Sequence, residues 1–262
     1  MLRTVLIVLL SCLGVLVLLD GVRRAQNRPA HGTALVVTAR DSTPPQRASP
    51  PPPPPIALTP PTGTPALDLL ARLAVRRRIV REGTQVYLDL LFPHTDSVVA
   101  RWYERTTLLV ELAPDTTLTR WSPALLDEAR AGMRAWDATG ASPTLREAAA
   151  ADTADIMVRW VDVLPDTGQV GSTVLNWGPD GIVHRATVTL ALRRNTDSLA
   201  LPSRARIRVA THEFGHALGL PHSDNPDDIM FPTSPVASPS ARDQATLRLL
   251  YVLFPGSLRV QP

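Results

Sequence analysis

The stretch THEFGHALGLPHSDNPDDIMFP, residues 211–232, holds the side chains that decide the fold and the chemistry of this chain. His212 and His216 are four residues apart, which places both imidazoles on one face of a predicted helix. Gly219 can adopt a left-handed backbone without steric cost, so we expect it to end the helix and turn the chain back. The turn brings in His222 as a third nitrogen ligand. Three neutral imidazoles suit zinc and leave its fourth position open for water, as in catalytic rather than structural sites.

Glu213 directly follows the first histidine, about 100° further round the helix, where its carboxylate can reach a water on the zinc without being a ligand. It is the candidate general base, because zinc lowers the pKa of its water to roughly 7. The predicted reaction is hydrolysis of a peptide bond. The alternative is a helix with a packed histidine and a solvated glutamate, which the third histidine at this spacing disfavours.

The stretch 212–222 resembles the extended zinc signature of the metzincin metalloproteases, and Met230 lies where that clan has its Met-turn. Within the clan, HEFGHALGLPHS is most similar to the matrixins, the matrix metalloproteinase family, with Ser223 after the third histidine. Pro232 stands where astacin-like and serralysin-like enzymes have a tyrosine. The resemblance covers roughly residues 101–254 and is strong only at the histidine stretch.

The resemblance implies an α+β, metzincin-like zincin fold. Its features are a twisted, mostly parallel sheet with an antiparallel edge strand, an active-site helix and a C-terminal helix. Local patterns predict strands at 106–112, 154–161 and 183–192, a helix at 122–139, and a last helix that starts with a capping box at Ser240. The family would place the last strand at the sheet edge, where an extended substrate can add as an antiparallel strand.

The resemblance also implies the roles of the site residues: His212, His216 and His222 as ligands of one catalytic zinc, Glu213 as base, and Met230 as a structural floor. Calcium is a further candidate ion, although aspartates in loops more commonly cap turns. The aspartates concerned are Asp152, Asp155, Asp166 and Asp180. His184 alone cannot form the second zinc site that animal matrixins have, so we interpret it as an ordinary strand residue.

Composition limits the partners and the compartment. All 27 basic residues are arginine, the net charge is only +3, and no stripe of arginine and aromatic residues is present, so no nucleic-acid partner is indicated. Cys12 is the only cysteine, which excludes a disulfide within the chain. No cysteine follows it that could keep a matrixin-like enzyme latent.

Four segments are expected along the 262 residues. Residues 1–22 form a signal peptide or signal anchor around the apolar run 4–19, which is shorter than the ~20 residues of a comfortable bilayer span. Residues 23–65 are a proline-rich linker. Residues 66–98 form an N-terminal helical, propeptide-like segment whose basic helix either packs on the domain or rests on anionic lipid. Residues 99–257 form the catalytic domain.

The sequence thus predicts an exported zinc endopeptidase that acts on protein or peptide substrates. It is either anchored in the cell-envelope membrane through residues 4–19 or secreted, for example into a periplasm, and its oligomeric state is open. One alternative is a non-proteolytic, zinc-bearing surface module that uses the fold for binding, which the presence of Glu213 disfavours. The other is a narrow-specificity processing protease tethered to the membrane.

Overall fold

The computed structural model of the chain describes residues 65–93, 97–103, 105–150, 152–166 and 168–259. The predicted signal or anchor segment and the linker up to residue 64 lie outside the described residues. Across the described ranges, no helix is both long and apolar enough to span a bilayer.

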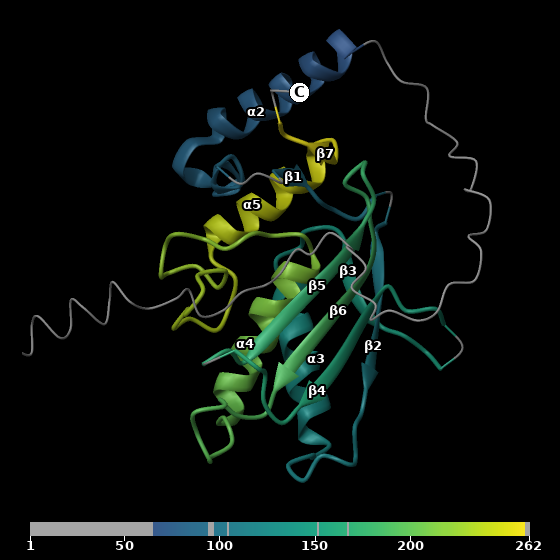
Figure 1. The fold of residues 1–262 in the computed structure, drawn as a ribbon, viewed down its shortest axis with the longest axis vertical. Coiled ribbons are helices and arrows are strands. Elements are labelled where there is room, and N and C mark those ends of the chain that lie inside the picture. Colours follow the sequence, from purple (N-terminus) through teal and green to yellow (C-terminus); the bar gives the residue numbers. More distant parts are fainter. Residues whose placement is uncertain (1–64, 94–96, 104, 151, 167, 260–262) are drawn as a thin grey trace, which may run out of the picture. The chain divides into compact units, whose positions relative to one another are not determined.

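A five-stranded sheet forms the centre of the fold, in the order β3-β2-β4-β6-β5 (Figure 1). Neighbouring strands are parallel from β3 to β6, and β5 pairs antiparallel with β6. The strands are β2 (Thr107–Ala113), β3 (Thr144–Glu147), β4 (Ile156–Val161), β5 (Gly171–Trp177) and β6 (Val183–Ala191). The predicted α+β class, with a mostly parallel sheet and an antiparallel edge strand, is confirmed.

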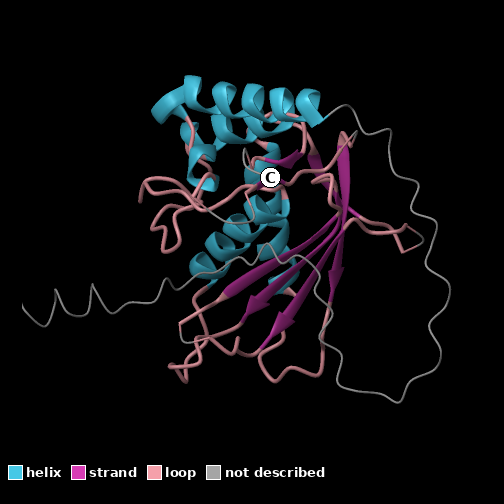
Figure 2. Cartoon of the chain, turned by 45° about the horizontal axis from the view of Figure 1, so that its top comes forward, coloured by secondary structure: helices cyan, strands magenta, loops and turns pink. Residues whose placement is uncertain are grey.

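Two helices, α3 (Ala124–Asp137) and α4 (Ser203–Ala217), cover one face of this sheet (Figures 1 and 2). Burial alternates along β2 and β4, as expected for strands with one face packed against helices. Helix α3 approaches α4 closely at Gly132, where a Cβ atom would lie 2.9 Å from the backbone nitrogen of Thr211. Trp136 of α3 also donates its indole N–H to the carbonyl of Thr211 at 2.8 Å. Helix α3 therefore fixes the backbone just before His212.

The chain before the sheet packs with the C-terminal part of the fold. Helix α2 (Pro65–Glu82) ends at Gly83, which has a φ of +54°, and two 3-10 turns follow, η1 (Gly83–Gln85) and η2 (Leu88–Leu91). Val86, Tyr87 and Leu88 are buried in the hydrophobic core. Turn η1 contacts the last helix, α5 (Ala241–Val252), and strands β1 (Val98–Val99) and β7 (Gly256–Ser257) pair antiparallel.

One strand position differs from the expectation. The family resemblance predicts residues 183–192 at the sheet edge, and this is wrong, because β6 lies inside the sheet between β4 and β5. The two edge strands are β3 and β5, the second of them antiparallel to its neighbour, and the local patterns predicted neither. A short turn between β5 and β6 lets them pair as an antiparallel hairpin, while β6 remains parallel to β4. The other predicted strands and helices agree with the structure to within a few residues at each end.

The close contact between α3 and α4 leads to a stability prediction. Gly132→Ala adds a methyl group where backbone atoms of α4 lie within 3.0 Å, so the helices must separate. We expect a loss of about 1–3 kcal/mol in the free energy of unfolding, measured by urea denaturation, despite the better helix propensity of alanine. Arg134→Ala, at an exposed position of the same helix, is the control and should change stability little. A Gly132→Ala variant as stable as the parent would refute the close-packing argument.

Candidate metal centre

The second half of α4 presents two histidines to the interior. All eight residues 210–217 are buried, because this part of the helix lies between α3 and strands β5 and β6. The four-residue spacing places the rings of His212 and His216 edge to face, with centroids 4.7 Å apart and their Nε2 atoms at 3.0 Å. The helical placement predicted from the sequence is therefore observed.

The end of α4 brings the third histidine to the same point. Gly219 has a φ of +99°, its N–H donates to the carbonyl of His216, and the N–H of Leu220 donates to the carbonyl of Gly215. This pair of bonds is a Schellman motif, which reverses the chain after a helix. The ring of His222 then lies 4.7 Å from that of His216 and 5.3 Å from that of His212.

Backbone carbonyls determine which nitrogen each helical histidine turns inward. Nδ1 of His212 lies 2.7 Å from the carbonyl of Ile229, and Nδ1 of His216 lies 2.8 Å from that of Leu220. A carbonyl only accepts hydrogen bonds, so each Nδ1 carries the proton and each Nε2 presents a lone pair to the other ring. Burial lowers the pKa of His212 to about 4 and also lowers that of His216, where the neighbouring histidines add to the effect. Both rings are neutral at pH 7.

This donor set fits a zinc ion. Two neutral Nε2 lone pairs that face each other repel unless a cation lies between them. One ligand nitrogen from each of His212, His216 and His222 lies within 4.8 Å of the others, and in the described part of the chain no other group of His, Cys, Asp or Glu side chains is arranged in this way. Nitrogens bound to one tetrahedral zinc, each at about 2.0 Å, are separated by about 3.3 Å. The Nε2 separation of 3.0 Å is close to that value.

Glu213 is buried against strand β5. Its Oε2 atom accepts a hydrogen bond from the Thr173 hydroxyl at 2.7 Å, and the same hydroxyl lies 3.1 Å from the Glu213 carbonyl. Burial raises the pKa of the Glu213 carboxyl to about 8, and the Thr173 hydrogen bond opposes part of this shift. Gly171 leaves the space that the carboxyl fills, since a Cβ atom there would lie 2.3 Å from Oε1.

Sequence reasoning missed Gly171 and Thr173, because it did not identify β5 as a strand. The stretch GSTVLNW does not alternate between apolar and polar residues in step with burial, because polar Thr173 is buried and apolar Val174 is exposed. Its only strand signal is the pair of β-branched residues Thr173 and Val174.

Met230 lies directly against the histidine helix. It is fully buried, and a Cβ atom on Gly215 would come within 2.2 Å of its sulfur. Its carbonyl accepts from the N–H of Ser223, the residue after His222, at 2.9 Å. The turn at Ile229 and Met230 thus holds both the ring of His212 and the chain next to His222.

The remaining candidates lie elsewhere. His184 is an exposed residue of β6. Three of the four loop aspartates, Asp152, Asp155 and Asp180, accept hydrogen bonds from backbone N–H groups with their side chains. For Asp166, the described hydrogen bond involves the backbone, since its carbonyl accepts from the N–H of Gln169. None of the four belongs to the cluster of potential metal ligands within the described residues.

Comparison with known proteins finds similarity in the stretch of the chain that holds the three histidines. Residues 195–251 match the family described as Matrixin. A matrilysin from the cat, Felis catus, is 45% identical over 53 residues, which are 20% of this chain and 17% of the matrilysin. The chain therefore spans less than a fifth of the length of this relative. The family match contains α4, His222, the turn at Met230 and most of α5, so the part of the chain that holds the three histidines is similar to the matrixin family.

Proposed function

We propose that this protein is a zinc-dependent endopeptidase with one catalytic zinc held by His212, His216 and His222. The observation that supports it most strongly is the convergence of three histidine nitrogens, two of the rings being oriented by backbone carbonyls. A zinc ion at this point supplies Lewis-acid polarisation of the peptide carbonyl and makes water more acidic. Met230 packs against α4 at Gly215 and has a structural role in this proposal.

Glu213 acts as the general base in this proposal. The positive charge of a bound zinc would lower the pKa of this buried carboxyl, so that its carboxylate can take a proton from the attacking water while the new C–O bond forms at the peptide carbonyl. The same group then gives that proton to the nitrogen of the leaving amine as the C–N bond breaks, so atoms and charges balance. The Thr173 hydroxyl holds Oε2, and the bare backbone at Gly171 gives the carboxyl its space beside α4. Strand β5 therefore positions the base.

The substrate in this proposal is an extended stretch of protein or peptide that lies along β5. This strand pairs with β6 on one side only, so its second edge can accept an additional antiparallel strand. Recognition of this kind uses backbone groups and tolerates varied side chains, which suits an endopeptidase. Strand β5 takes over the role that the sequence analysis gave to residues 183–192.

Export completes the proposal, with the catalytic domain in the cell envelope, periplasm or medium. It relies on the apolar run at residues 4–19, which lies outside the described residues. Membrane attachment through that run and a narrow substrate range are refinements of the same function, and a peptide-library screen separates broad from narrow specificity. A calcium ion remains a further candidate from the sequence.

Replacement of the base tests the mechanism. In Glu213→Gln the side chain keeps its size and an oxygen for the Thr173 hydroxyl but cannot take the proton. We expect about 10²–10⁴-fold lower kcat on a quenched peptide library, with one zinc per chain retained by metal analysis. Glu147→Gln, an exposed glutamate paired with Arg130, is the matched control and should keep full activity. A parent that binds zinc but cleaves no peptide would favour the non-proteolytic binding module.

Replacement of single histidines tests the metal site. His216→Ala or His222→Ala removes one of three nitrogens, so we expect zinc affinity, measured by chelator competition, to fall at least as far as the 10–100-fold losses that follow mutation of outer-sphere partners. His184→Ala removes an exposed imidazole and should leave the affinity unchanged. Equal zinc affinity in all three variants would show that zinc binds elsewhere.

A further inference from the structure

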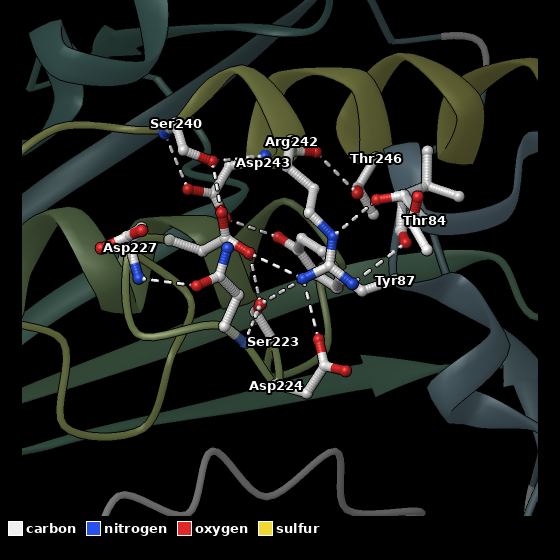
Figure 3. A network of polar contacts seen from close by, with 12 residues as sticks. Thr84, Tyr87, Ser223, Asp224, Asp227, Ser240, Arg242, Asp243 and Thr246 are labelled. Carbon is white, nitrogen blue, oxygen red and sulfur yellow. Dashed lines mark hydrogen bonds and ion pairs between the residues drawn. The ribbon is translucent and has the colours of Figure 1, made fainter.

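The inference concerns Arg242 at the start of α5, and it builds on the proposed function. We infer that Arg242 is a positioning residue for the third histidine, and that residues 79–91 are a permanent part of the active domain. The guanidinium ties the backbone of η1 to the loop that follows His222 (Figure 3). We call this contact the Arg242 clasp, formed by Arg242, the side chains of Ser223, Asp224 and Asp228, and the carbonyls of Thr84 and Val86.

On one side, the clasp holds the histidine loop. Nη1 of Arg242 lies 3.0 Å from the Ser223 hydroxyl, 2.8 Å from Asp224 Oδ1 and 2.9 Å from Asp228 Oδ2. The Ser223 hydroxyl in turn donates to Asp228 Oδ2. Because Ser223 directly follows His222, the position of the third imidazole depends on this loop.

Asp228 makes the clasp more than a surface contact. Its side chain is 1% exposed, and its only ion-pair partner among the described residues is Arg242. Loss of the cation would leave a buried carboxylate with its hydroxyl donors alone, Ser223 and Ser240. A buried charge without its counter-ion is strongly unfavourable, so the loop would have to open toward water.

On its other side, the clasp holds the N-terminal segment. The Nε atom of Arg242 donates to the carbonyl of Thr84 and Nη2 donates to that of Val86, each at 3.2 Å. The guanidinium also lies 5.1 Å from the centre of the Tyr87 ring. The flat, forked guanidinium suits these several partners, which a lysine ammonium cannot bind in the same geometry.

The next residue of α5 forms a second connection. Asp243 accepts from the Tyr87 hydroxyl at 2.8 Å through Oδ1 and from the N–H of Ile229 at 2.8 Å through Oδ2. The carbonyl of Ile229 is the group that orients the ring of His212. Two consecutive residues of α5 therefore connect the segment 84–87 to two of the three histidines.

These contacts assign residues 79–91 to the catalytic domain. Ile79, Val86, Tyr87 and Leu88 are at most 3% exposed and belong to the same core as α4 and α5. Cleavage after residue 91 and release of the segment would expose this core and remove the carbonyls of Thr84 and Val86 from the clasp. The segment thus braces the site, in contrast to a propeptide that leaves on activation.

The test uses the full chain with Arg242→Ala, Arg242→Lys and the control Arg248→Ala, an exposed arginine of the same helix that contacts Thr139 and Gln244. Amide hydrogen exchange of the metal-free protein reports residues 223–230 directly. We expect faster exchange there in Arg242→Ala but unchanged exchange in the central strands β4 and β6. Zinc affinity should fall about 10–100-fold, as for other residues that orient metal ligands. The absorption bands of the cobalt-loaded protein should shift, which a general loss of stability would not cause.

Arg242→Lys distinguishes the contribution of the ion pair with Asp228 from that of the hydrogen bonds to the N-terminal segment. The ammonium can still neutralise Asp228, so most of the zinc affinity should return, while exchange at residues 84–88 should remain fast. Tyr87→Phe removes only the hydroxyl that donates a hydrogen bond to Asp243. It is the variant to use if Arg242→Ala does not fold. It should speed exchange at Ile229 and shift the cobalt bands.

Two results would overturn the inference. One is equal exchange and equal zinc affinity in Arg242→Ala and Arg248→Ala, and the other is full zinc affinity and activity in a chain cleaved after residue 91. A parent protein that fails to cleave peptides contradicts the proposed function alone. Exchange in the metal-free protein decides the role of Arg242 in that case as well.

Discussion

The hydrogen bonds from the Nδ1 atoms of His212 and His216 to backbone carbonyls control the chemistry of this site. They fix the tautomer of each ring and turn both Nε2 lone pairs to one point, where burial keeps the rings neutral. The accepting carbonyls belong to Leu220 and Ile229, which come after the helix in the chain. The helix, its reversal at Gly219 and the turn before Met230 must therefore fold together before the ligand set exists.

Buried carboxyl groups extend this dependence to the rest of the domain. Glu213, Asp228 and Asp243 are all at most 4% exposed, and each receives hydrogen bonds from another segment of the chain. Strand β5 supplies the donor to Glu213, and η2 is preceded by Tyr87, which donates to Asp243. A carboxyl group removed from water without its donors is costly, so each of these acids stabilises one arrangement of the segments around the site. The same hydrogen bonds that satisfy the acids also place the histidines.

The part of this site that the sequence could predict is the part that follows local rules. Helical spacing placed His212 and His216 together, Gly219 adopted the expected left-handed backbone, and the capping box at Ser240 and Asp243 is present. The contacts that were missed join residues far apart in sequence. Thr173 lies 40 positions from Glu213, and Tyr87 lies 156 positions from Asp243. No periodicity or turn signal contains such pairs, and the misplaced edge strand has the same origin, since strand order is a property of the whole sheet.

The glycine at the start of β5 also limits how the sheet can assemble. Side chains alternate along a strand, so a slip of one residue in the β5–β6 hairpin would exchange its two faces. Such a slip would bring the side chain of Val170 or Ser172 to the place now occupied by the carboxyl of Glu213, where there is no room even for a Cβ atom. A misregistered hairpin could not close over α4. The space that the Glu213 side chain fills thus restricts how β5 can align with β6.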